Sequence, residues 1–170
     1  SSPVVPNDDP TLLFSNAGMN QFKTIFTGER AAPYKRACSV QKCIRVSGKH
    51  NDFEDVGYDG THHTFFEMLG NWSLGDYFKD GAIRMSYEFL TSPDWLGIDP
   101  EILSVTVFQG DDEVPADTES AEVWKSLGIP ESRIHFLPRG DNWWGPAGET
   151  GPCGPDTEMF IDTGIPPCGP

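Results

Sequence analysis

The pattern of apolar and polar positions in the first half of the chain predicts two strands joined by a long polar loop. Residues 41–46 can run extended, and residues 64–69 are rich in the aromatic and apolar side chains that favour strands. We therefore expect an antiparallel pair joined by the intervening segment. That loop contains three of the four histidines of the chain, His50, His62 and His63.

A helical period appears after Asp76. Apolar residues recur there at intervals of four, three and four, which is the spacing of an amphipathic helix. The members of this stripe are Phe78, Ala82, Met85 and Phe89. We predict a helix that Asp76 can cap, that ends near Ser92-Pro93, and that buries this stripe in the core.

The rest of the chain mixes strands and helices without a regular β-α-β order. Three further strands are predicted, at 104–108, 134–137 and 157–162. A second helix is predicted at about 120–127, with Gly128 at its C-terminal end. The strand at 157–162 could lie beside the strand at 64–69. This mixture predicts an α+β fold with a mainly antiparallel sheet flanked by helices.

Composition is typical of a soluble globular protein. The 170 residues are 37% hydrophobic and 12% aromatic, which suffices for one domain with a core. No apolar run approaches the roughly 20 residues of a membrane helix, and the N-terminus has neither the basic nor the apolar segment of a secretion signal. We expect a cytoplasmic protein. The four cysteines form no C-x-x-C pair, so free thiols are favoured over a structural zinc site.

Charge is distributed unevenly along the chain. The formal net charge is −14, yet seven of the twelve Lys and Arg residues lie between residues 23 and 49, where Glu29 is the only acid. This basic zone could meet the phosphates of RNA, and a solvated face is the alternative. The acidic turn at 110–113 is interpreted as a solvated loop in preference to a magnesium site.

Cations and imidazoles occur together around the loop between the first two strands. Lys42, Arg45 and Lys49 accompany the three histidines, a combination suited to phosphate or carboxylate oxygens, so we infer an anionic substrate. Neither G-x-G-x-x-G nor G-x-x-x-x-G-K-[ST] occurs, which excludes a Rossmann turn and a P-loop. A metal-dependent hydrolase is an alternative that no ligand spacing supports. Its ligands would come from His50, Asp52, His62, His63 and Glu67.

Two other segments could line a small-ligand pocket. Residues 16–22 mix small, amide and apolar side chains, which suits close approach of the backbone to a ligand with Met19 as a flexible wall. A tight turn with Met19 and Phe22 in the core is the favoured alternative. The adjacent Trp143 and Trp144, beside a Gly/Pro-rich loop, suit an aromatic pocket wall.

Four blocks of sequence carry a family resemblance. They are DPTLLFSNAGMNQFK at 9–23, QKCIRVSGKHNDFEDVG at 41–57, HHTFFEMLGNWSLGDYFK at 62–79 and TGPCGPDTE at 150–158. Together they closely resemble the catalytic domain of the alanyl-tRNA synthetases, which are class II aminoacyl-tRNA synthetases. The resemblance covers essentially the whole chain and implies an antiparallel sheet flanked by helices. It also implies that L-alanine attacks the α-phosphate of ATP, and that the alanyl group then passes from alanyl-adenylate to tRNA(Ala).

The resemblance implies the roles of several residues around the loop. Arg45 matches the motif 2 arginine that grips the α-phosphate and the alanine carboxylate, and is the expected catalytic residue. His63 is expected to contact ATP, with His62 near its β- and γ-phosphates, and Phe66 to stack on adenine. Regular strand alternation would put His62 and His63 on opposite faces, unless a loop or bulge occurs there.

Two more roles follow from the resemblance. Trp144 is expected to line the ATP and alanine pocket, and Met19 to help close the space for the alanine side chain. Mg²⁺ is expected to accompany ATP, although no residue of this chain is assigned as a metal ligand. The oligomeric state is left open.

Residues 1–170 are expected to be part of a catalytic domain. They contain the motif 1-like and motif 2 regions, whereas motif 3 and a helix expected before Ser1 are absent, so this segment is expected to be inactive alone. The chain departs from the family pattern at Gly60-Thr61 and at Asp156. A non-catalytic, synthetase-like binding or regulatory module is the alternative function.

Overall fold

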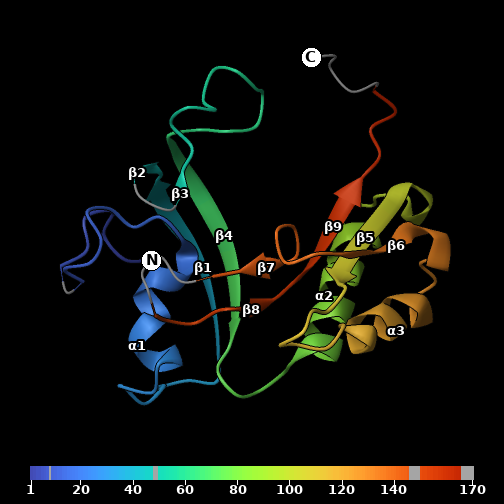
Figure 1. Cartoon of the computed structure of the whole chain (residues 1–170), viewed down its shortest axis with the longest axis horizontal. Helices are drawn as coiled ribbons and strands as arrows, with labels where there is room; N and C mark the ends of the chain where they lie inside the picture. Colours follow the sequence, from blue (N-terminus) through green and yellow to red (C-terminus); the bar gives the residue numbers. More distant parts are fainter. Residues whose placement is uncertain (8, 48–49, 146–149, 166–170) are drawn as a thin grey trace. The chain divides into compact units, whose positions relative to one another are not determined.

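The computed structural model describes residues 1–7, 9–47, 50–145 and 150–165 (Figure 1). The chain forms two compact units, which we describe one at a time. Unit 1 comprises residues 1–76 and 145–152, and unit 2 comprises residues 77–144 and 153–170.

Unit 1 is built on an antiparallel pair of strands. β1 (Arg36–Ile44) pairs with β4 (Phe65–Ser73) along its whole length, which confirms the pair predicted around 41–46 and 64–69. β2 (Val46–Ser47) and β3 (His50–Asn51) form a second, short antiparallel pair directly after β1. The His62-His63 pair precedes β4 and lies in the loop, so strand alternation does not constrain it.

The inner face of the β1–β4 pair packs against two short helical segments, η1 (Gly18–Phe22) and α1 (Lys23–Phe26). Trp72 of β4 is central to this packing, because its ring centroid lies 5.0 Å from that of Phe22. The indole Nε1 also donates to Ser39 Oγ on β1, at 2.9 Å. The packing of one indole therefore ties both strands to the helical layer.

The two faces of this strand pair differ in exposure. Gln41 and Cys43 are buried on the inner face, where Cys43 is paired with Phe66. Val40, Phe65 and Leu69, which alternate with the inner residues, are exposed. Burial thus alternates with the two-residue period of a strand that has one covered face.

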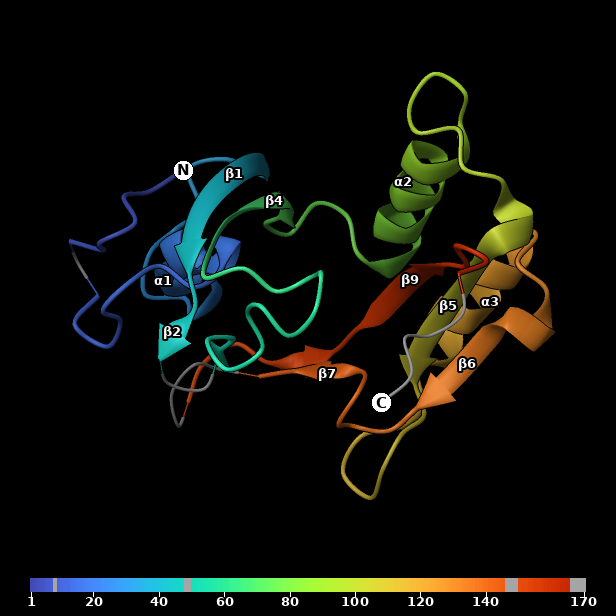
Figure 2. The same ribbon diagram turned by 90° about the horizontal axis from the view of Figure 1, so that it is seen from above.

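Unit 2 is built on a three-stranded sheet whose order, β6-β5-β9, can be followed in Figure 2. The central strand β5 (Leu103–Phe108) is parallel to β6 (Ile134–Leu137) and antiparallel to β9 (Thr157–Ile161). The predicted strands at 104–108, 134–137 and 157–162 are therefore confirmed. The predicted place of the last strand, beside 64–69, is wrong because β9 pairs with β5.

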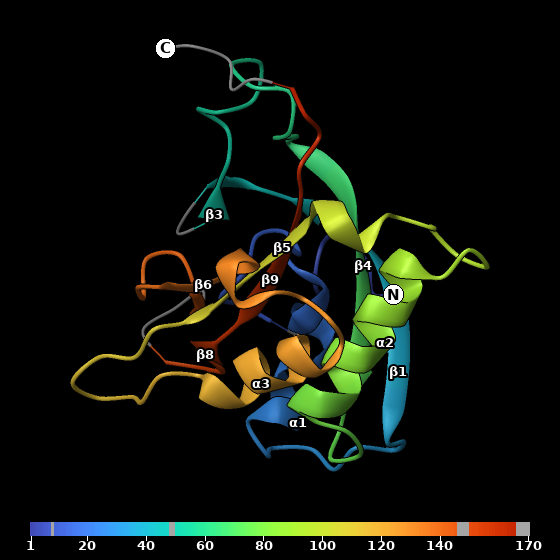
Figure 3. The ribbon, with the colours of Figure 1, turned by 90° about the vertical axis from the view of Figure 1, so that its right-hand side faces the viewer.

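Two helices, α2 (Lys79–Thr91) and α3 (Thr118–Ser126), pack against one another beside this sheet (Figure 3). Both predicted helices are confirmed. Short 3-10 turns, η2 (Pro100–Ile102) and η3 (Glu131–Arg133), precede β5 and β6. Gly128 follows α3 with a φ of +99°, a conformation that favours glycine after a helix.

The face that α2 buries differs from the predicted one. Ile83 is buried in the core of unit 2, whereas Phe78, Met85 and Phe89 of the predicted stripe are 76%, 40% and 49% exposed. Tyr87 and Leu90 pack around the same core, so Ile83, Tyr87 and Leu90 form a second stripe of helical spacing. Periodicity alone does not distinguish the two stripes.

The start of α2 also differs from the prediction. Its N-cap position is Phe78, and no side chain caps it. Asp76, the predicted cap, instead accepts a hydrogen bond from Nε of Arg36 at the start of β1. By contrast, Asp117 caps α3, since its carboxylate accepts from the Ser120 N–H at 3.2 Å and from Ser120 Oγ at 2.7 Å.

The remaining strands, β7 (Trp143–Trp144) and β8 (Gly154–Pro155), form one antiparallel pair. The α+β class is confirmed, and the described strands form four small sheets in which only the β5–β6 pairing is parallel. None of the helices in the described part of the chain has the length and apolar character that crossing a membrane requires. Cys38, Cys43 and Cys153 are free thiols, as predicted, and Cys168 lies outside the described residues.

Gly70 leaves the space that the Trp72 ring occupies. A Cβ atom at Gly70 would lie 2.7 Å from Cζ2 of Trp72, so Gly70→Ala must displace the indole. We expect the free energy of unfolding to fall by about 1–3 kcal/mol, as measured by chemical denaturation. The control is Gly60→Ala, where a Cβ meets nothing within 4 Å. Equal stability of the Gly70 variant and the wild type would contradict this packing.

The β1–β4 register predicts different reactivity for two cysteines of one strand. Cys38 is exposed, whereas Cys43 is buried and its burial raises the pKa of the thiol. Because the thiolate is the nucleophile, iodoacetamide should label Cys38 quickly and Cys43 only after unfolding. Peptide mass spectrometry distinguishes the sites. Fast labelling of Cys43 in the folded protein would mean that the strand faces are exchanged.

Candidate functional site

Arg45 lies where the chain leaves β1 and enters the loop. Its backbone N–H donates to the Thr64 carbonyl, and its carbonyl accepts from the Asp52 N–H, both at 3.2 Å. Thr64 directly precedes β4, so these bonds continue the pairing of the sheet beyond Ile44. The backbone of Arg45 is therefore fixed from two sides.

Three groups surround the guanidinium of Arg45. Its Nε donates to the Asn16 carbonyl at 2.9 Å, and its Nη1 lies 4.0 Å from Oδ2 of Asp52. Its central carbon lies 5.4 Å from the centroid of the Phe66 ring, within cation–π range. The side chain remains 23% exposed, so an anion can reach a guanidinium whose orientation is already set.

The structure brings Arg45 and Phe66 together. Phe66 is half-buried on the inner face of β4, while Phe65 points to the exposed face. An aromatic face next to a cation suits a ligand that combines a flat ring with an anionic group. The predicted role of Phe66 in adenine stacking agrees with this placement and stays a prediction.

His62 is bound to a nearby carboxylate in the loop. Its Nδ1 lies 2.5 Å from Oδ2 of Asp59, and Oδ1 of Asp59 accepts from the backbone N–H groups of Thr61 and His62. The hydrogen bond that His62 donates to Asp59, together with the charges of Asp59, Asp52 and Asp55, raises the pKa of His62. The hydrogen bonds from His62 and Thr61 lower the pKa of Asp59. Both effects favour the imidazolium form.

One carboxylate acts on both predicted anion-binding groups. Asp52 lies 4.0 Å from Nη1 of Arg45, and its charge contributes to the raised pKa of His62. The other histidine of the pair, His63, is exposed. An anion that approaches Arg45 therefore meets a guanidinium beside the carboxylate of Asp52, and the charge of Asp52 also favours the protonated form of His62.

Met19 lies in a segment that contacts Arg45. It is half-buried in η1, directly after Gly18, whose N–H points to Sδ of Met68 at 3.2 Å. The Asn16 carbonyl that binds Arg45 belongs to the same segment. Phe22 is buried, as the tight-turn interpretation predicted, whereas Met19 is only partly covered.

Trp144 belongs to unit 2, whereas the other predicted site residues belong to unit 1. It lies on β7 and is 41% exposed. Its neighbour Trp143 packs between the ring of Phe108, at 5.5 Å, and the guanidinium of Arg139, at 4.0 Å from the ring centroid. The aromatic wall predicted from two adjacent tryptophans therefore consists of one packed ring and one exposed ring.

The acidic turn at 110–113 is exposed, as predicted for a solvated loop, and two of its acids also bind Arg139. Arg139 Nη2 lies 2.6 Å from Oδ2 of Asp111 and 3.2 Å from Oε2 of Glu113. Hydrogen bonds from the backbone of Val114 and Glu113 and from Arg139 lower the pKa of Asp111. The turn thus holds the arginine that stacks on Trp143.

Acids also neutralise part of the basic zone at 23–49. Among the described residues of this zone, three cations form ion pairs within unit 1, and the pairs are Lys23–Asp9, Arg36–Asp76 and Arg45–Asp52. The positive potential of this zone is therefore weaker than the sequence count implies.

A pocket of about 240 Å³ opens beside η1 and α1 and is lined in part by Asn20, Lys23 and Arg30. None of the six predicted site residues lines it. Within the described residues, no group of three His, Cys, Asp or Glu side chains could hold a metal ion. The candidate site is therefore defined by Arg45 and the side chains around it.

Sequence reasoning missed three residues that shape this site. Asn16 supplies the carbonyl that orients Arg45, Asp59 binds His62, and Asn20 supports Asn16. The Asp59-x-x-His62 spacing is typical of a side-chain-capped turn and was a usable signal. The backbone role of Asn16 leaves no signal in the side-chain pattern.

The chain is similar to one family model and to several known proteins. The family model of tRNA synthetases class II (A) matches residues 1–168. The alanine–tRNA ligase of Treponema pallidum is 59% identical over 165 residues, which cover 97% of this chain and 26% of the relative. The mitochondrial alanine–tRNA ligase of Drosophila melanogaster is 60% identical over 164 residues, which cover 95% of this chain and 16% of the relative.

A third relative gives the same result. The alanine–tRNA ligase of Haemophilus influenzae is 53% identical over 172 residues, which cover 96% of this chain and 19% of the relative. The chain thus spans about a quarter, or less, of the length of these curated relatives.

The Asp59–His62 hydrogen bond predicts a measurable titration. Asp59→Asn removes the carboxylate that contributes most to the raised pKa of His62, so that pKa should fall toward 6.5. Proton NMR of the imidazole resonances against pH measures it. Asp55→Asn is the matched control, because Asp55 acts on His62 only through its charge and should lower the pKa less. Equal effects of the two variants would contradict the hydrogen bond.

Proposed function

The chain belongs to the family of class II tRNA synthetases (A), and from this premise we propose that it is the ATP- and alanine-binding part of an alanine–tRNA ligase. The three relatives described above all carry that name. The observation that carries the proposal is the environment of the Arg45 side chain. Its guanidinium lies over an aromatic ring and is oriented by a backbone carbonyl, yet remains open to an anion.

In the proposed reaction, a carboxylate oxygen of L-alanine attacks the α-phosphorus of ATP. The bond between that phosphorus and the oxygen bridging to the β-phosphate breaks, so the products are alanyl-adenylate and pyrophosphate. The reacting groups are both anionic, and charge shifts between them during the displacement. Arg45 can donate to two oxygens at once, which brings the anions together and stabilises the transition state.

The surroundings of Arg45 support a nucleotide as the anionic ligand. Phe66 offers a flat apolar face 5.4 Å from the guanidinium carbon, and we propose that adenine stacks on this ring. The raised pKa of His62 favours a cation, which suits a place near the β- and γ-phosphates. We propose a further ATP contact for His63, which is exposed in the same loop.

From the family resemblance, we propose that Met19 limits the space for the alanine side chain, and that Trp144 separately contributes to the binding of ATP and alanine. The segment 16–20 reaches Arg45 through the Asn16 carbonyl, which supports a place for Met19 near the amino acid. The exposed ring of Trp144 suits a pocket wall. Because one methyl group is worth only about 1–3 kcal/mol, such a pocket discriminates weakly between alanine and glycine.

Mg²⁺ enters this proposal only with ATP. The described residues offer no group of three side chains for a metal ion, so no residue of the chain is assigned to it. Mg²⁺ commonly binds nucleotides through their phosphates, with few protein ligands. We further propose that the alanyl group passes to tRNA(Ala), that the catalytic sheet is the antiparallel class II sheet, and that the protein is cytoplasmic. The Drosophila relative is described as mitochondrial.

Alanine-dependent exchange of pyrophosphate into ATP tests the proposal, using the protein at the full length of its relatives. Arg45→Ala removes the guanidinium, and we expect exchange to fall about 100- to 1,000-fold, the usual effect of losing one such donor. Arg84→Ala is the matched control, because Arg84 pairs with Asp80 on the surface of α2. It should leave the exchange rate unchanged.

Two outcomes would contradict this proposal. If the full-length protein folds and binds ATP but shows no exchange with any amino acid, a non-catalytic, synthetase-like module replaces the enzyme. If exchange occurs and Arg45→Ala retains the wild-type rate, the enzyme assignment stands and the role of Arg45 is wrong.

A further inference from the structure

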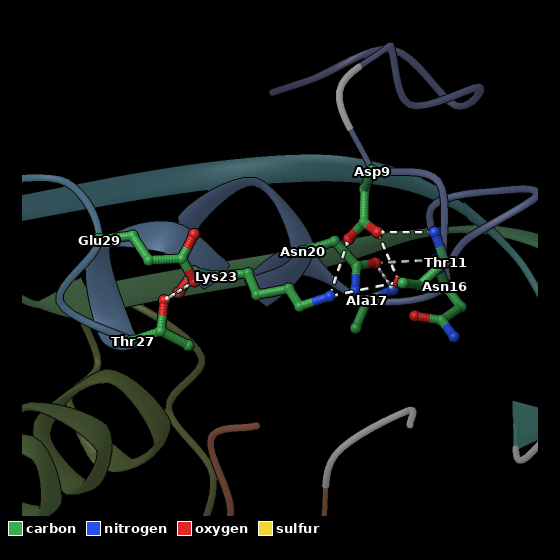
Figure 4. Close-up of polar contacts among 8 residues, drawn as sticks. All are labelled: Asp9, Thr11, Asn16, Ala17, Asn20, Lys23, Thr27 and Glu29. Atoms are coloured by element: carbon green, nitrogen blue, oxygen red, sulfur yellow. Dashed lines mark hydrogen bonds and ion pairs between the residues drawn. The ribbon is translucent and has the colours of Figure 1, made fainter. Parts of the chain in front are cut away.

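The side chain of Asn20 is bound to the backbone a few residues before it. Its Oδ1 accepts from the N–H of Ala17 at 2.8 Å and from the N–H of Asn16 at 2.9 Å (Figure 4). The Asn20 N–H returns a hydrogen bond to the Ala17 carbonyl, at 3.3 Å. One amide oxygen therefore fixes two consecutive N–H groups where the chain enters η1.

One of these N–H groups belongs to the peptide unit that orients Arg45. The Ala17 N–H and the Asn16 carbonyl are parts of the same planar peptide, and in a trans peptide they point in opposite directions. Asn20 binds the N–H on one side, and Nε of Arg45 binds the carbonyl on the other, at 2.9 Å. Rotation of this peptide would break both bonds together.

The chain before this peptide is fixed independently. Ser15 is buried, its N–H donates to the Val4 carbonyl at 2.7 Å, and its carbonyl accepts from the Ile44 N–H at 3.0 Å. Ile44 is the last residue of β1 and directly precedes Arg45. The backbone of Ser15 is therefore bound to the strand end from which the Arg45 side chain extends. Asn20 then binds the next peptide along the chain through its N–H, which belongs to Ala17.

We propose that Asn20 is a positioning residue for Arg45, acting through the 16–17 peptide. This inference rests on the proposed function, in which the Arg45 guanidinium binds the anionic groups of ATP and alanine. The hydrogen bond from the Ala17 N–H to Asn20 also polarises the 16–17 peptide. This strengthens the hydrogen bond that the Asn16 carbonyl accepts from Arg45. A structural role of Asn20 at the start of η1 would instead affect only the stability of the fold.

A double-mutant cycle on alanine-dependent pyrophosphate exchange separates these two roles. Asn20→Leu keeps the branched shape and the number of heavy atoms of the side chain and removes the acceptor. Arg45→Lys keeps the positive charge and removes the Nε that binds the Asn16 carbonyl. The four proteins of the cycle, at the full length of the relatives, are compared at equal concentrations of folded enzyme.

We expect Asn20→Leu to lower the exchange rate constant about 10- to 100-fold, in line with misplacement of a catalytic group. In the Arg45→Lys background the same substitution should change the rate less than about 3-fold, because the link is already absent. Asn20→Asp keeps the accepting oxygen and should retain most of the wild-type rate. Gln21→Leu removes the neighbouring amide, which binds Gln41, and should leave the rate constant unchanged.

The outcomes distinguish failure of this inference from failure of the proposed function. If Asn20→Leu lowers exchange by the same factor in both backgrounds, Asn20 acts independently of Arg45 and the inference is overturned. If neither Arg45→Lys nor Arg45→Ala affects exchange, the proposed role of Arg45 fails first. Should Asn20→Leu not fold, Asn20→Gln takes its place in the cycle, since it keeps the amide but displaces the oxygen.

Discussion

The last pair of the β1–β4 ladder, Ile44 opposite Phe65, determines where the loop residues can lie. A shift of β4 by one residue would turn Phe66 outward and would separate the Thr64 carbonyl from the Arg45 N–H. The register itself depends on the contrast between the packed inner face and the exposed outer face. Burial of Gln41, Cys43 and the Trp72 indole is thus the physical basis for the position of the guanidinium.

The sequence predicted elements whose signal is local. The strand pair around the loop, both long helices and the strand at 104–108 follow from spacing and composition within a short window. The buried face of α2 could not be predicted in this way, because two apolar stripes of the helix have helical spacing. One runs from Phe78 to Phe89 and the other from Ile83 to Leu90, and packing against α3 and β5 selects the second. The partner of β9 was missed for a similar reason, since strand pairing between distant segments leaves no local signal.

The candidate site shows the same division. Arg45, His62 and Phe66 could be named from sequence through their family resemblance, and the structure explains how Arg45 and His62 are held. Asp59 was recognisable from its spacing to His62, whereas the Asn16 carbonyl was not, because every residue has one. The positive potential of the basic zone was overestimated, since acids outside the zone pair with three of its described cations.

The link from Asn20 to Arg45 through the 16–17 peptide affects which residues can be substituted. It passes through the backbone of Asn16 and Ala17, and almost any pair of residues offers the same peptide group. Proline at 17 is the exception, because it has no N–H. Tolerance to substitution should therefore be high at 16 and 17 and low at 20, although residue 16 itself carries the carbonyl that Arg45 binds.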